Sequence, residues 1–431
     1  MNKNQQGAVV LLVTSVLLVS ALMLTFGSYR SVFYQIKRAQ NEVEARQQQW
    51  KSEGGLECGF TYIVNQKLQS IPNNLATVCN SYNFSSLNAD LTNPEVLLSQ
   101  VGHSSVNKAI IFSSSGGSGA MRSTSDVISF GSALFSPPDP GEFNSAADAY
   151  ECIGAVVKYR FIATGITNHG VGSAIESPGT GHDSSKDCKA SHKTSTAVKS
   201  GIWENSSGVI SSHNVGLDIQ RDDTIDPFKD FFGVDKSKWQ EVRDDVDNDF
   251  IKVSMPSSSV DCYSQFSGSI VNGQPNKIWI DGSCQLASAD VTNIVNLQAA
   301  HPGTDLFLLV HDGVFGVTGS GDISGVFFHF NNTYSPIPSQ WDPMTEVKPF
   351  VNTVFSDLIN TMYGPSSTLT PYHATYAQAG SFSFTGGQFF DTEGQMALFN
   401  NSLNFSFNSD VINEFGFSPK PRWQKGSWND L

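Results

Sequence analysis

Six cysteines are the residues in this sequence with the clearest chemistry, because an even number of thiols can be oxidised to disulfides. Fifteen connectivities are possible, and the short separations of 21, 36 and 22 residues favour pairing in sequential order. No pair has Cys-x-x-Cys spacing, which argues against zinc binding and thioredoxin-type redox chemistry. The candidate disulfides are Cys58–Cys79, Cys152–Cys188 and Cys262–Cys284.

An acidic run at Asp244–Asp249 has the alternating carboxylates of a calcium loop. Phe250 stands where such a loop needs glycine, and Pro256 stands where it needs a bidentate glutamate. We therefore favour a solvated acidic helix end, with calcium binding at Asp245–Asp249 as the alternative. A Gly-x-Ser-x-Gly nucleophile elbow and a phosphate-binding loop do not occur. The sequence predicts no catalytic residue, no metal site and no cofactor.

The composition indicates an acidic chain that is rich in strands and turns. Only 15% of the 431 residues are charged, and the formal net charge is −14, which argues against general nucleic-acid binding. Thirty Phe, 11 Tyr and 7 Trp are enough to build cores, so the low charge does not indicate disorder. The charge is uneven, because residues 1–55 have a net charge of +3 and the remainder −17.

The N-terminal end contains a predicted membrane-spanning helix. Ala8–Phe26 is a stretch without a charged residue, and as a helix it would extend roughly 28 Å, close to the thickness of a bilayer core. The stretch is too long for the apolar part of a secretory signal, and no small-x-small cleavage site follows it. Tyr29–Trp50 continues as an amphipathic helix with its apolar residues on one face. These residues are Val32, Ile36, Ala39, Val43 and Trp50.

The short polar leader Met1–Gly7, followed by this apolar span and amphipathic helix, resembles a type IV prepilin. The resemblance implies that a prepilin peptidase cuts between Gly7 and Ala8 and N-methylates the new terminus. Cleavage before the apolar segment keeps that segment as an anchor in the membrane and later as the core of a filament. The residues expected to pack there include Ala8, Leu12, Leu17 and Phe26.

Two further features resemble a subgroup of this family. Major pilins carry a glutamate at the fifth mature position, where this chain has Leu12. PilX-type minor pilins and K-type pseudopilins of type II secretion often lack that glutamate and are associated with filament initiation and the tip. Ser52–Phe60 also resembles the Ala-Glu-x-Gly-Leu-Glu stretch of PilX-type proteins. The paired glycines within it predict either a bend or close packing of the helix.

The expected fold class is α+β, with a long pilin helix, a mixed α/β pilin-like part and a C-terminal β-rich domain. Short apolar strands separated by Gly and Asn turns favour a right-handed β-helix for that last domain. Ala155–Thr164 is predicted as a single half-buried strand. The expected segments are a leader at 1–7, a helix at 8–70, a pilin-like domain at 71–250, and a β-solenoid at 251–431 interrupted by a helix at 345–362.

Charge counting around the span favours the opposite membrane orientation, but every cysteine follows the span and so indicates an oxidising compartment. We therefore expect a single-pass inner-membrane protein whose large domain is periplasmic and then extracellular in the pilus.

The expected function is that of a non-enzymatic minor pilin that primes or tips assembly and presents an adhesive surface. Its expected partners are other minor and major pilins, the inner-membrane assembly machinery and the prepilin peptidase. The alternatives are a K-type pseudopilin and a membrane-anchored, polysaccharide-active β-helix enzyme.

Overall fold

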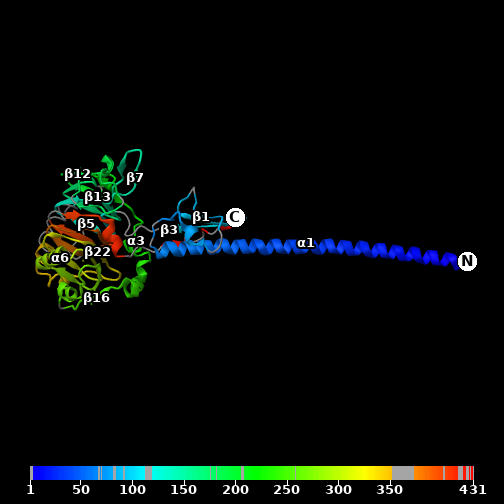
Figure 1. Cartoon of the computed structure of the whole chain (residues 1–431). Coiled ribbons are helices and arrows are strands. Elements are labelled where there is room, and N and C mark those ends of the chain that lie inside the picture. The colour runs from blue at the N-terminus through cyan, green and yellow to red at the C-terminus, as the bar shows by residue number, and fades with distance from the viewer. Residues whose placement is uncertain are drawn as a thin grey trace. The chain divides into compact units, whose positions relative to one another are not determined.

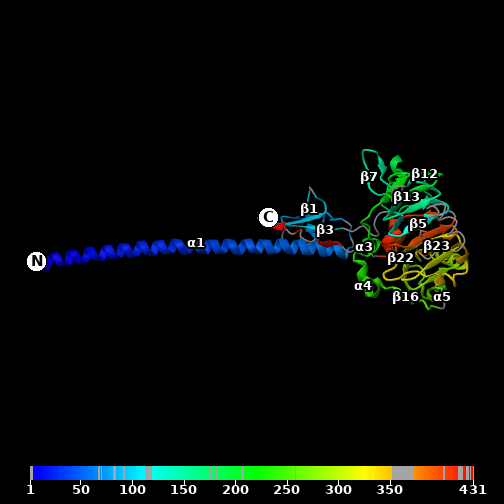
Figure 2. The same cartoon turned by 180° about the vertical axis from the view of Figure 1, so that it is seen from behind.

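The structure is a computed structural model of the chain, and its residues form two compact units. Unit 1 comprises Met1–Phe112 and Lys420–Leu431, and unit 2 comprises Ser113–Pro419. Figures 1 and 2 show their secondary structure from two sides. The residues described are 3–66, 68, 70–80, 84–90, 93–111, 119–174, 176–180, 182–204, 208–257, 259–351, 373–400, 403–415, 421–423, 427 and 429–430.

Unit 1 is built on a single continuous helix, α1 (Lys3–Asn65), drawn in blue in Figure 1. Among the residues described, this is the one helix that is long and apolar enough to cross a membrane. Its length and composition are consistent with single-pass anchoring in a membrane. The helix ends at Asn65, earlier than the expected boundary at residue 70, and it passes through both Gly54 and Gly55 without a break.

An antiparallel sheet packs against the C-terminal part of α1. Along the sheet the order is β1-β2-β3-β28, and β29 also pairs with β3. One face of β2 and β3 is buried against Leu56 and Ile63 of α1, together with Leu75 of the short helix α2 (Leu75–Val78). The strands are β1 (Ser86–Ala89), β2 (Val96–Val101), β3 (Ser104–Ile111), β28 (Arg422–Trp423) and β29 (Asn429–Asp430).

Unit 2 consists of stacked layers. In each layer, successive strands of the chain lie on different sides of the stack, which are called here the first, second and third face. Strands on one face pair in parallel with those of neighbouring layers. The first-face strands are β4 (Met121–Ser123), β9 (Ala155–Val157), β15 (Ile219–Arg221), β16 (Ile251–Ser254), β17 (Asn276–Asp281), β19 (Leu306–His311), β22 (Gly325–Phe330) and β25 (Gln388–Asp391).

The second face contains another sheet of eight strands, in which all neighbours except those around β13 pair in parallel. Its strands are β5 (Asp126–Ser129), β10 (Phe161–Ala163), β13 (Ser200–Glu204), β14 (Ile210–His213), β18 (Cys284–Leu286), β20 (Phe315–Thr318), β23 (Ala374–Ala379) and β26 (Met396–Asn400). The third face is divided into two sheets. One has β6 (Ser132–Phe135), β11 (Gly165–Asn168), β12 (Ser195–Thr196) and β27 (Leu403–Phe405), and the other has β21 (Gly321–Ile323) and β24 (Phe382–Phe384).

The spatial order of the layers differs from their order in the sequence. On the first face the order is β15-β9-β4-β25-β22-β19-β17-β16. The chain thus begins in the middle of the stack, runs to one end, restarts at the other end and returns to the middle. The expected boundary near residue 250 is therefore wrong, because β4 pairs directly with β25 within one sheet. The C-terminal residues after 420 instead belong to unit 1.

Phenylalanine builds unit 2 on both sides of the first-face sheet. Inside, Phe327 lies 4.8 Å from Phe315 and 5.9 Å from Phe390 between ring centroids. On the other side, Phe231 of α3 (Pro227–Phe232) lies 5.6 Å from Phe328. Central strands such as β19 and β22 are consequently buried along their whole length, as is typical of a sheet covered on both faces.

Two smaller predictions differ from the structure. Ala155–Thr164 forms two strands, β9 and β10, because the chain turns from the first face to the second between them. Of the helix expected at 345–362, only residues up to Val351 are described, and helical turns begin at Lys348. The remainder of that prediction lies outside the described residues.

Candidate functional site

The predicted processing site lies within the first turns of α1. Gly7 is exposed, and a β-carbon built there would have open space around it. The packing candidates Leu12, Leu17 and Phe26 are exposed by 65%, 64% and 63%. These side chains are apolar and make no shielding contact within the described chain, so they are available to lipid or to another helix.

The polar residues of the apolar span satisfy their own hydrogen bonds. Thr14 Oγ1 donates to the carbonyl of Leu11 at 3.0 Å, and Ser20 Oγ donates to that of Val16 at 2.8 Å. Ser15 and Thr25 form the same kind of bond one turn back. A hydroxyl bonded within its own helix leaves no unsatisfied donor in a lipid environment. The span is therefore compatible with a bilayer despite these residues.

The glycines after the amphipathic stretch serve close packing, one of the two predicted roles. A β-carbon at Gly55 would overlap the side chains of Ser99 and Phe84, and one at Gly59 would lie 3.1 Å from Leu97 Cδ2. The sheet of unit 1 thus approaches the helix closely at these positions. Residues of the stretch Ser52–Phe60, Gly55 and Gly59 among them, therefore contact this sheet.

All six cysteines are paired in the structure, in sequential order. Cys58–Cys79 joins α1 to the end of α2 in unit 1, with the two α-carbons 6.1 Å apart. Cys262–Cys284 joins the N-terminus of α5 (Tyr263–Phe266) to β18 in unit 2. Each disulfide thus stabilises one unit and does not connect the two.

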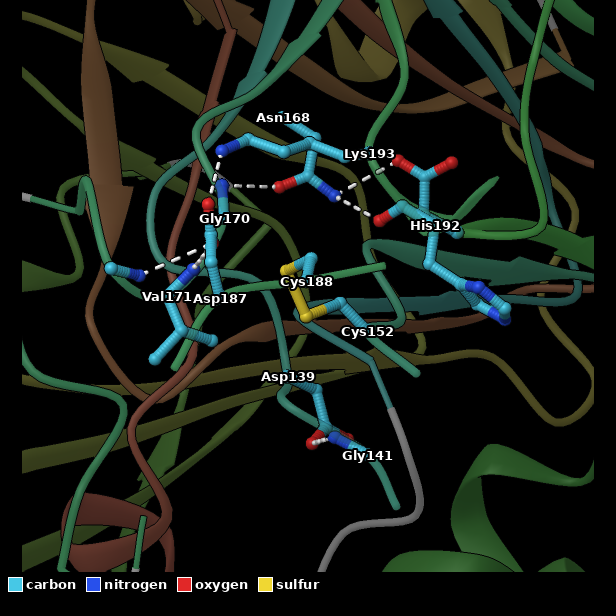
Figure 3. Close-up of a disulfide and its surroundings, with 12 residues drawn as sticks. Asp139, Gly141, Cys152, Asn168, Gly170, Val171, Asp187, Cys188, His192 and Lys193 are labelled. Carbon is cyan, nitrogen blue, oxygen red and sulfur yellow. Dashed lines mark hydrogen bonds and ion pairs between the residues drawn. A yellow bond between two sulfur atoms is a disulfide. The ribbon is translucent and has the colours of Figure 1, made fainter. Parts of the chain in front are cut away.

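The third disulfide, Cys152–Cys188, fastens the long polar loop that follows β11 (Figure 3). Asp187 organises this loop, because its carboxylate accepts a hydrogen bond from Val171 N at 2.9 Å and binds Lys193 Nζ at 2.6 Å. Partial burial alone would raise the pKa of Asp187, but Lys193 and the backbone N–H groups outweigh it and lower that pKa. The disulfide and these contacts of Asp187 tie the described residues of the loop together.

Asp218 holds together residues at the two ends of the same loop. It is fully buried and accepts hydrogen bonds from Asn168 Nδ2 and from Thr194 N, both at 2.9 Å. Asn168 in turn contacts the carbonyl of His192, as Figure 3 shows. Buried carboxylates of this kind are costly unless fully hydrogen-bonded, so this network is structural.

The acidic run at Asp244–Asp249 forms ion pairs with cations and does not gather into a metal site. Asp244 binds Arg243 and Lys252, each at 2.9 Å, and hydrogen bonds from these two residues lower the pKa of its carboxyl. Asp245 accepts from the N–H of Asp247 at 3.0 Å. Within the described residues, no three His, Cys, Asp or Glu side chains are grouped so that they could hold a metal ion.

A buried histidine that pairs with a partly exposed aspartate was not predicted from the sequence. His311 Nδ1 lies 2.7 Å from Asp281 Oδ1, and Trp239 of α4 (Trp239–Asp244) lies over the imidazole at 4.1 Å between ring centroids. Asp281 also accepts from Trp279 Nε1 and lies 3.4 Å from Arg243. The pair therefore attaches the α3–α4 connection to the first-face sheet, and this connection leads from one end of the layers to the other.

The comparisons with known proteins add no relative to this description. No family model, no curated protein and no solved structure matches the chain.

Proposed function

We propose that this chain is a minor type IV pilin of the PilX-like kind, with a structural and not an enzymatic role. The observation that carries the proposal is the build of unit 1. An exposed apolar stretch of α1 begins directly after Gly7, the proposed cleavage residue. The C-terminal part of the same helix packs on a small antiparallel sheet. A helix of this kind can anchor one subunit in a bilayer and afterwards pack against the helices of neighbouring subunits.

A position at the tip, or a role in initiation, is supported by two features. Leu12 provides no carboxylate for pairing with the terminal amine of a subunit ahead of it. Unit 2 is inserted in the sequence between β3 and β28, two strands of the unit 1 sheet that pair through Ile111 and Arg422. Subunits packed side by side in a shaft would have to accommodate this large insertion at every repeat, whereas a subunit at the tip would not.

We further propose that unit 2 is a right-handed parallel β-helix and that it is exported. The recurrence of strands in the same order on three faces supports the β-helix. The three disulfides support an oxidising destination, first the periplasm and then the pilus surface. A K-type pseudopilin would share all these features, and neighbouring pilus or secretion genes would separate the two alternatives.

Substitution of Gly7 tests the proposal in cells. Gly7→Leu places a side chain at the cleavage position, while its surroundings in α1 are open and the fold stays intact. We expect the substituted chain to retain residues 1–7 and the cells to lose pili. Gly27→Leu, also at an open position of α1, is the control and should be processed normally. Normal processing and piliation with Gly7→Leu would contradict the proposal.

A further inference from the structure

The third face of unit 2 has a structural discontinuity that the other two faces lack. On the first and second faces, eight strands pair without interruption from one end to the other. On the third face, β24 and β27 lie next to each other in consecutive layers but belong to different sheets. The ladder of backbone hydrogen bonds is therefore open between these two strands.

A cavity of about 90 Å³ lies at this discontinuity. Outward-facing residues of four strands contribute to its wall, together with residues that follow those strands, the core residue Phe405 and the loop residue Glu176. Asp322 and Ser383 are register partners in one sheet, and Asn404 and Leu134 are register partners in the other. The lining consists of Leu134, Ser136, Glu176, Asp322, Ser383, Thr385, Asn404, Phe405 and Ser406.

Two hydroxyl groups in this lining have unused hydrogen-bonding capacity. Ser406 is only 6% exposed, yet its Oγ has no hydrogen-bond partner among the residues described. Ser136 Oγ is likewise buried and unpartnered within the described part of the chain. A buried hydroxyl without a partner costs free energy, so these two serines mark a place where the packing around the cavity leaves polar groups unsatisfied.

The loop that carries Glu176 is fastened beside this cavity by α8 (Ser409–Glu414). The N–H of Ser409 donates to the carbonyl of Pro178 at 3.0 Å. Thr180 donates to Asp410 through both its N–H and its Oγ1, each at 2.8 Å. Two residues of this loop, Pro178 and Thr180, are thus held by α8, and they lie close to Glu176 in the chain.

The chemistry of the lining selects a neutral ligand with several hydroxyl groups. Asp322 and Glu176 provide carboxylate acceptors, with Asp322 also accepting from Ser383 Oγ, and Asn404 provides both a donor and an acceptor. Among the residues that line the cavity, all of them described, none is lysine or arginine, so an anionic ligand would meet only negative charge. We propose that this cavity binds one neutral hexose unit of a surface glycan through the edge of its ring.

The volume sets the size of the ligand. Pockets for drug-sized molecules usually measure about 300–1,000 Å³, so a cavity of 90 Å³ admits part of one sugar ring and not a chain of sugars. Single contacts of this size bind weakly, and useful adhesion would come from several pili acting together. Unit 1 and its processing play no part in this site.

The test is a titration of the full-length protein in a detergent without a sugar headgroup. The probes are the methyl glycosides of glucose, galactose, mannose and N-acetylglucosamine, and ligand-observed NMR reports saturation transfer and dissociation constants. We expect at least one glycoside to bind. Ser406→Leu, which fills the cavity, and Asn404→Ala should each weaken that binding at least tenfold.

Ser132→Leu is the matched control, because Ser132 is exposed on β6 and does not line the cavity. The proposal is overturned if no glycoside binds, or if Ser406→Leu and Asn404→Ala bind as tightly as Ser132→Leu. Binding of calcium chloride alone that is abolished by the same two variants, without glycoside binding, would also overturn it. Because Gly7 is not involved, these outcomes leave the pilin proposal to its own test.

Discussion

The two units of the chain differ in how much of their apolar surface they bury. Unit 1 leaves large apolar side chains exposed along α1, including Leu11, Met23 and Leu24, each exposed by more than 70%. Unit 2 covers its first-face sheet on both sides, and Phe307, Phe327 and Phe328 are fully buried. Unit 2 is thus complete as a folded body, whereas unit 1 needs lipid or neighbouring helices to cover its apolar surface.

The two units also differ in net charge. Unit 1 contains 11 Lys and Arg against 7 Asp and Glu, while unit 2 contains 15 against 33. An acidic body repels copies of itself and stays soluble, and a slightly basic helix associates with membranes. The two units therefore differ in charge as well as in exposed apolar surface.

The largest expected effect comes from the phenylalanine core of unit 2. Phe328→Ala removes a ring that lies 5.8 Å from Phe389 and 5.3 Å from Phe232, between centroids. We expect unit 2 to lose about 3–5 kcal/mol of unfolding free energy. Hydrogen exchange measured peptide by peptide should show faster exchange in β19, β22 and β25, with β2 and β3 unchanged. Equal loss of protection in both units would contradict the conclusion that unit 2 is stabilised independently of unit 1.

Alanine substitution of one glycine in each unit should have opposite effects on stability. Gly325 has φ +151°, and a β-carbon there would overlap the carbonyl of Leu306, so Gly325→Ala should destabilise unit 2 by about 3 kcal/mol. Gly27 lies in α1 with open space around it, so Gly27→Ala should raise helix stability by about 1 kcal/mol or less. Thermal unfolding followed by circular dichroism measures both. Similar effects of the two substitutions would contradict the assigned backbone conformations.

A smaller effect is expected from pH. A hydrogen bond with Asp305 and then burial raise the pKa of Glu414 to about 7, from an ordinary value of 4.5. The folded state therefore keeps a proton that the unfolded state releases, so unit 2 should lose stability as pH rises from about 4.5 to 7. Chemical denaturation of the wild type at pH 5 and pH 8 measures this loss. Glu414→Gln should make the difference smaller, and an unchanged difference would contradict the assignment.

Local patterns in the sequence predicted many elements but not the arrangement of layers. The short apolar strands expected between turns are present, and β19 (Leu306–His311) is one of them. The pairing of β4 with β25 could not be predicted, because it joins residues more than 260 positions apart. The predicted boundary near residue 250 was wrong for this reason.

The site was predictable to a similar extent. Sequential disulfides followed from spacing alone, because short loops between cysteines close readily. The third-face cavity was missed, since its walls come from β6, β21, β24, β27 and a loop that are distant in the sequence. Alternating polar residues in short strands, such as Asp322 and Asn404, are a signal that could have indicated an outward-facing polar surface.

The chemical identity of the mature N-terminus tests the central claim most directly. The full-length protein is purified from the membranes of its own cells, digested, and its N-terminal peptide is identified by tandem mass spectrometry. The account predicts a peptide that begins at Ala8, carries an N-methyl group and lacks Met1–Gly7. A peptide that retains Gly7, or a terminus created by cleavage after Phe26, would contradict the assignment of α1 as a pilin helix.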